Sequence, residues 1–174
     1  IVYGSPKVAA YHKKALNLDV NFNIIQDAAD AKAERINLLA VTDEDVKIEF
    51  ATPSDATTLL SRKAIDRAID DYKGGMVCAI VNAPINEKHF SNTLEKGSGL
   101  AQYIAKQLGN TGDVLEMVLN ECLRITSVSG DLALRDVESE VTKEKIEQTV
   151  KLLHQSLRRD FMISIPRIAV LALN

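Results

Sequence analysis

The chain has 174 residues, of which 46% are hydrophobic, and its 21 basic and 24 acidic residues give a net charge of −3. A chain of this size can bury a sizeable core, as one domain or as two small lobes. The balanced charge, the lack of a basic run and the absence of tryptophan argue against nucleic-acid binding. No apolar run is long enough to span a membrane, so no membrane partner is expected.

The two cysteines, Cys78 and Cys122, stand in apolar or mixed surroundings and lack Cys-x-x-Cys spacing. We therefore predict two buried free thiols. Free thiols are typical of a reducing compartment, so we expect a soluble, cytoplasmic protein. Both ends of the chain fall in apolar runs, at residues 1–3 and 168–173, which favours a truncated or trimmed chain.

The first part of the chain mixes short strand patterns with one helical pattern. Residues 1–3 predict a strand, and Ser5 followed by Pro6 predicts a capped helix that runs to about Asn17. Alternating apolar residues predict strands at 19–25 and 46–50, and residues 36–41 form another apolar run. The turn around Pro53 is the best lobe boundary. We expect residues 1–53 to be part of an N-terminal lobe and residues 54–174 a central α/β lobe, which could also pack as one domain.

The middle of the chain predicts a long helix followed by a buried strand. Ser54 or Asp55 caps the helix, which runs to about Lys73 before two glycines. Residues 76–81 form an uncharged apolar run that Pro84 ends, which is typical of a strand covered on both faces of a parallel sheet. Ligands bind at the carboxyl ends of such strands, so we expect one wall of any site here, flanked by Asn82 and Asn86.

The rest of the chain continues the alternation of helices and strands. A Gly-Ser-Gly segment ending at Gly99 precedes a helix over 100–108; it could form a phosphate cradle or serve only as a helix start. Residues 114–119 and 123–129 predict two strands, which could pair antiparallel as an excursion from the main sheet. Thr142 is expected to cap a further helix. A last strand is expected over 167–173. The pattern predicts an α/β fold with a largely parallel or mixed sheet.

Several segments resemble 4-hydroxythreonine-4-phosphate dehydrogenase of vitamin B6 biosynthesis. Residues 83–86 resemble that family's Ala-Pro-Ile-Asn-Lys motif, although Glu87 replaces the lysine. Further similar segments follow in the same order and at similar spacing, at residues 123–125, 153–161 and 166–174. Residues 1–11 look like the family's N-terminal lobe, so the resemblance covers essentially the whole chain.

The resemblance implies a fold and an activity. The family is a two-lobed α/β/α sandwich related to the isocitrate dehydrogenase fold. It is a homodimer with its active site in a cleft near the subunit interface. The family oxidises 4-phosphohydroxy-L-threonine with NAD and a divalent metal held by histidines. We therefore expect this chain to be a homodimer of similar architecture.

The departures from the family pattern fall on its functional motifs. The Gly-His-Thr-Glu motif, which contacts substrate, falls on Gly99, Leu100, Ala101 and Gln102, so both polar contacts are apolar here. The Thr-Thr-His motif, which supplies a metal ligand, places Asp131 at the histidine position. A second metal histidine would follow Asn174, and the family's Gly-Asp-Pro segment would precede Ile1. Such changes are typical of a segment rebuilt for packing, as in an engineered variant.

Three hypotheses about function follow. The first is a catalytically inactive scaffold or engineered fragment of the family, without a catalytic residue or tightly bound cofactor or metal. Its vestigial substrate positions are Asn82, Asn86, Ser98, Gly99, Leu100 and Ala101, and its vestigial metal position is Asp131. The second is an active NAD- and metal-dependent oxidoreductase. The third is a module that retains only phosphate or nucleotide binding.

Overall fold

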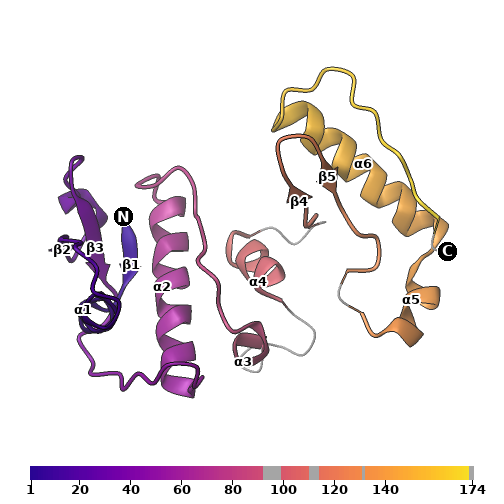
Figure 1. The fold of residues 1–174 in the computed structure, drawn as a ribbon. Helices are drawn as coiled ribbons and strands as arrows, with labels where there is room; N and C mark the ends of the chain where they lie inside the picture. The colour runs from indigo at the N-terminus through magenta and orange to yellow at the C-terminus, as the bar shows by residue number, and fades with distance from the viewer. Residues whose placement is uncertain (92–98, 110–113, 131, 173–174) are drawn as a thin grey trace. The chain divides into compact units, whose positions relative to one another are not determined.

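The computed structural model describes residues 1–91, 99–109, 114–130 and 132–172. The chain forms two compact units, Ile1–Thr111 and Gly112–Asn174, and Figure 1 shows the helices and strands of each. No helix within the described ranges is long and apolar enough to cross a membrane. The lobe boundary near residue 53 stays a prediction, while strand β1 and helix α2, which lie on either side of it, pack together in the first unit.

The first unit contains a parallel three-stranded sheet. Strand β3 (Ile36–Ala40) lies between β1 (Val2–Gly4) and β2 (Phe22–Ile25), and both neighbours run parallel to it. The register pairs Tyr3 and Ile25 with the same central residue, Leu39, which is fully buried. These strands confirm the predicted α/β class with a parallel sheet, because β1, the predicted strand at 19–25 and the apolar run at 36–41 all pair in one direction.

Among the described residues of the first unit, five helical segments accompany the sheet. They are α1 (Pro6–Ala15), the 3-10 turn η1 (Ala28–Asp30), α2 (Asp55–Lys73), α3 (Glu87–Ser91) and α4 (Leu100–Gln107). Ser54 caps α2 as predicted: its Oγ accepts from Thr57 N at 3.2 Å, and Thr57 Oγ1 accepts from Ser54 N at 3.2 Å. Pro6 begins α1 as predicted, but the buried Ser5 hydroxyl makes no capping bond, so that part of the prediction is wrong.

A polar network fastens α2 to the sheet. The Tyr3 hydroxyl of β1 donates to Asp71 Oδ2 at 2.9 Å, and Arg67 Nε donates to Asp71 Oδ1 at 3.2 Å. Arg67 also reaches Asp27, before η1, at 3.2 Å. Asp71 is only 9% exposed, and a carboxylate so buried needs such donors to offset its lost hydration. The network therefore fixes the position of α2 along β1.

Two hydrophobic clusters form the core of the first unit. One lies at the sheet, where Ile25, Ala28 and Leu39 are buried. The other joins the helices: Ile65 and Ile69 of α2 pack with Phe90 of α3 and Tyr103 of α4. Ile80, Ile85, Leu100 and Ile104 pack against this second cluster, which we call the helix cluster. It holds α3 and α4 against α2, and Figure 1 shows these two short helices beside α2.

The predicted central strand at residues 76–81 is wrong. The segment is irregular, with bends at Met76 and Cys78, and pairs with none of the described strands, and Val81 is 95% exposed. Only part of it is covered, through Ile80 in the helix cluster. An apolar run specifies a tendency to be buried, but a strand also needs a hydrogen-bonding neighbour, and none of the described strands pairs with this segment. The predicted burial of Cys78 fails with the strand, and Cys122 is exposed as well.

The predicted strand at 46–50 is also wrong, because this stretch is irregular. Its alternating residues Val46 and Ile48 are half-buried without a strand partner among the described residues. Phe50 instead contacts aromatic side chains of α1, with ring centroids 5.5 Å from Tyr11 and 5.4 Å from His12. Side-chain contacts therefore hold this segment, where the prediction expected the backbone hydrogen bonds of a strand.

The second unit contains a short hairpin and two helices. Strands β4 (Val118–Leu119) and β5 (Arg124–Ile125) pair antiparallel, which confirms the predicted excursion, although each strand is shorter than expected. Helix α5 (Leu134–Glu140) was not predicted, whereas α6 (Lys143–Arg159) begins at its predicted cap, where Thr142 Oγ1 accepts from Lys145 N at 3.2 Å. Leu153 and Leu157 of α6 are buried. The predicted last strand is wrong, since described residues 167–172 are irregular.

Candidate functional site

The predicted site residues that the structure describes lie on three different segments of the first unit. Asn82 is exposed, and its Nδ2 donates to the carbonyl of the adjacent Ala83 at 2.9 Å. Asn86 lies at the start of α3, and Gly99 to Ala101 lie at the start of α4. Ser98 and Asp131 fall outside the described residues, so their predicted roles stay predictions.

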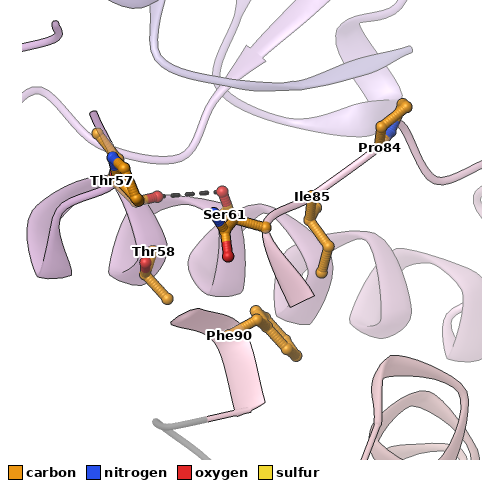
Figure 2. Close-up of a pocket in the computed structure, with 8 residues that line it drawn as sticks. Thr57, Thr58, Ser61, Pro84, Ile85 and Phe90 are labelled. Carbon is orange, nitrogen blue, oxygen red and sulfur yellow. Dashed lines mark hydrogen bonds between the residues drawn. The ribbon is translucent and has the colours of Figure 1, made fainter. Parts of the chain in front are cut away.

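A pocket of about 190 Å³ lies between α2 and the segment that leads into α3. Its lining includes Thr57, Thr58, Ser61, Pro84, Ile85, Asn86 and Phe90. Figure 2 shows the three hydroxyl residues on α2, with Ile85 and Phe90 beside them. Asn86 is therefore the one predicted site residue among those that line this pocket.

The hydroxyl groups of α2 are held by the helix itself. Thr57 Oγ1 and Thr58 Oγ1 each donate to the carbonyl of Ser54 at 2.9 Å, and Ser61 Oγ donates to the carbonyl of Thr57 at 3.0 Å, drawn in Figure 2. A hydroxyl has one proton and two lone pairs. Because each proton is committed to a backbone carbonyl, these oxygens face a neighbour mainly as acceptors.

Asn86 positions the opposite wall of the pocket. Its Oδ1 accepts from His89 N at 3.1 Å and its carbonyl accepts from Phe90 N at 2.9 Å, so it starts α3 as a capping residue does. The short helix places Phe90, 1% exposed, in the helix cluster, with its ring edge-on to Tyr103 at a centroid distance of 5.6 Å. The polar residue that suggested a site thus has a structural role as well.

A side chain of α4 itself is hydrogen-bonded to the backbone at the start of this helix. Gln102 Oε1 accepts from the backbone N–H of Gly99 at 3.1 Å, which occupies one amide that an anion would use. Leu100 packs against the helix cluster, and Ala101 is half-buried. A Cβ atom at position 99 would lie only 2.9 Å from Gln102 Oε1, so this hydrogen bond suits a glycine at that position.

Tyr103 links α4 to α2 through charged groups. Its hydroxyl donates to the Asp66 carboxylate, and Arg62 Nε donates to its oxygen at 3.2 Å while the guanidinium lies 5.3 Å from the ring centroid. Burial, followed by the hydrogen bond to Asp66, raises the pKa of Tyr103. A phenol with a raised pKa stays protonated at neutral pH, so Tyr103 serves to join the helices rather than as a base.

The described residues do not fit a metal held by histidines. His12 lies on α1 with its ring against Tyr11 and Phe50, His89 lies on α3, and His154 lies on α6 of the other unit. Across the described ranges, no three His, Cys, Asp or Glu side chains gather in a group able to hold a metal ion. The pocket is also smaller than the roughly 300–1,000 Å³ of typical sites for drug-sized ligands, so it does not fit a whole dinucleotide.

The hydroxyl wall of the pocket was missed by the sequence analysis. The signal was present as Thr57, Thr58 and Ser61, since residues spaced by three or four positions share one face of a helix. These residues were considered only as part of a helix and its cap. Hydroxyl residues near a helix start serve capping and ligand contact alike, so the spacing alone does not distinguish the two uses.

The parallel sheet and its accompanying helices define an α/β protein, with a small polar pocket between α2 and the segment that leads into α3. The whole chain, residues 1–174, matches the family model described as pyridoxal phosphate biosynthetic protein PdxA. The chain belongs to this family.

Relatives of known name agree with this assignment. The chain is 38% identical over 174 residues to 4-hydroxythreonine-4-phosphate dehydrogenase of Bacteroides thetaiotaomicron, covering all of this chain and 48% of that protein. It is 29% identical to the enzyme of the same name from a Sulfurihydrogenibium species, covering 53% of it. The chain thus spans about half the length of the curated relatives it matches.

Solved structures show the same fold. The dehydrogenase of this name from Klebsiella pneumoniae superimposes with a TM-score of 0.72 at 21% identity, covering 95% of this chain and 50% of that one. A Burkholderia phymatum structure of the same name gives 0.70 at 20% identity. At these identities the likeness establishes the fold alone, which confirms the α/β architecture that the resemblance implied.

Proposed function

We propose that this chain is a PdxA-family scaffold that does not carry out the dehydrogenase reaction. One observation carries the proposal: the segment aligned with the family's substrate motif is used for packing and capping. Leu100 contacts the helix cluster, and Gln102 bonds back to the amide of Gly99. Leu100 and Gln102 therefore each have a structural use that competes with substrate contact.

The energetics of such a site oppose catalysis. A polar substrate group placed beside Leu100 would lose its water without gaining a partner, at a cost of about 1–3 kcal/mol for each unpaired group. A divalent metal would supply Lewis acidity in the reaction that the resemblance implies. The described residues provide no cluster of side chains to hold it.

Family membership supports the alternative of an active oxidoreductase, because the relative at 38% identity is named for oxidation of 4-hydroxythreonine 4-phosphate. In that case NAD and a divalent metal would bind with residues outside those described here. A module that binds only phosphate has less support, since the Gly99 amide is already paired with Gln102.

We also propose that the chain is cytoplasmic and forms a homodimer. Large apolar side chains stand exposed in both units, among them Val81 at 95%, Leu134 at 89% and Leu171 at 87%. A homodimer, which the family resemblance implies, would cover some of these side chains.

The reaction itself tests the proposal. We would measure NADH absorbance with 4-phosphohydroxy-L-threonine, NAD and added zinc or magnesium. The comparison is between the unmodified chain and the triple variant Leu100→His, Ala101→Thr and Asp131→His. We expect no turnover from either protein. Turnover by the unmodified chain would overturn the scaffold proposal, and turnover by the variant alone would show that these three positions suffice to block the reaction.

A further inference from the structure

The pocket between α2 and α3 has a hydrogen-bonding character that selects one chemical class of ligand. We propose that it binds a small neutral polyol, a molecule of about the size of glycerol, in preference to an anion or an ammonium ion. The inference goes beyond the scaffold function and holds whether or not the chain is catalytic. It rests on which groups line the pocket and on how their protons are used.

The acceptor side of the pocket is fixed by α2. The protons of Thr58 Oγ1 and Ser61 Oγ go to backbone carbonyls at 2.9 and 3.0 Å, which leaves lone pairs for a ligand. The proton of Thr57 Oγ1 is used in the same way, and that oxygen already accepts from Ser54 N. A ligand therefore gains most by donating hydrogen bonds to Thr58 and Ser61.

Charge selects against ionic ligands. Among the described residues that line the pocket none is charged, so neither a phosphate nor an ammonium ion finds a partner of opposite sign. The positive end of the α2 dipole disfavours a cation. An anion at this helix start would face the Asp55 carboxylate of the first turn, and the N–H groups of Ser54 and Thr57 are already paired with each other's hydroxyls.

Size and apolar contact complete the match. Pro53, Pro84, Ile85 and Phe90 make most of the remaining lining apolar, so the CH groups of a polyol can pack there, and Asn86 adds a polar amide beside them. The volume of about 190 Å³ is below that of pockets for drug-sized ligands but exceeds the space a single water needs. A three- or four-carbon polyol offers hydroxyl donors on one side and apolar CH groups on the other, as the two walls require.

Backbone amide NMR of the unmodified chain tests the proposal. Glycerol, ethanolamine and inorganic phosphate are titrated in turn at the same concentrations. We expect glycerol to give saturable shifts confined to the pocket, at Ser61, Ile85 and Asn86 among others, and the other two compounds to give weaker shifts there. Shifts spread over both units, no saturation, or an equal response to phosphate would overturn the proposal.

A pair of variants separates a bound ligand from a general solvent effect. Ser61→Ala removes one acceptor and should weaken glycerol binding about two- to tenfold, as expected for one hydrogen bond. Ser139→Ala is the matched control, because its hydroxyl also donates to a helix carbonyl, that of Asp136 at 2.9 Å, but lies in the other unit. Equal binding by both variants would contradict the assignment of Ser61.

Discussion

Replacing Tyr3 with phenylalanine tests the network that fastens α2 to β1. The change removes the hydroxyl that donates to Asp71 Oδ2 at 2.9 Å, so a carboxylate that is 9% exposed loses one of its donors. A hydrogen bond to a charged group contributes about 1.5–3 kcal/mol. We therefore expect Tyr3→Phe to lower the free energy of unfolding by about 2 kcal/mol at neutral pH.

The same contact predicts a loss of stability at alkaline pH. Burial, followed by the hydrogen bond and the charge of Asp71, raises the pKa of Tyr3 from 10.0 to about 12. Because the folded pKa lies above the unfolded one, the fold favours the neutral hydroxyl. Its contribution is complete below pH 10 and is lost as the pH rises to about 12.

Urea denaturation followed by circular dichroism measures both effects. The parent chain, Tyr3→Phe and the control Tyr72→Phe are compared at neutral pH and across pH 10–12. Tyr72 is a suitable control because it is an exposed tyrosine on α2, the helix that Tyr3 contacts through Asp71. The reasoning is refuted if Tyr3→Phe is no less stable than Tyr72→Phe, or if the parent and Tyr3→Phe lose stability equally over the alkaline range.

Three further outcomes are expected. Ser54→Ala should lower the free energy of unfolding of the first unit by about 1 kcal/mol in a thermal melt, because it removes the α2 cap. Ser54→Asp should not lower it, because aspartate also caps helices. Equal losses in the two variants would contradict the cap. Asn37→Leu should cost about 3 kcal/mol in urea denaturation, since Asn37, 6% exposed, bonds the backbone of Lys32 and Arg35; a change under 1 kcal/mol would argue against it. Sedimentation should show a species heavier than 19.1 kDa, and a monomer at high concentration would rule out the proposed homodimer.

Local chemistry made part of the fold predictable. The caps at Ser54 and Thr142 were predicted correctly because the hydrogen bond joins residues three positions apart, so its partners stand in the sequence. The strand at 76–81 was not, because a strand depends on a neighbour that the sequence does not specify. The short helices α3 and α5 were missed for a similar reason, since a single turn or two is stabilised mainly by packing.

The candidate site was predictable only in part. The proline stop led to Asn86, which does line the pocket, but not to the hydroxyl residues of α2 that face it from a distant part of the chain. At the start of α4 the resemblance identified Leu100 and Ala101 as departures. It required the structure to place Leu100 at the helix cluster and Gln102 on the Gly99 amide.

The central claim is that the vestigial substrate segment at the start of α4 now serves packing, and the stability of Leu100→His tests it most directly. In urea denaturation, with Leu100→Met as the conservative control, we predict that Leu100→His loses about 2 kcal/mol and that Leu100→Met loses less than half of that. A histidine variant as stable as the parent would contradict the account, because it would show that position 100 remains free to hold a polar, substrate-contacting side chain.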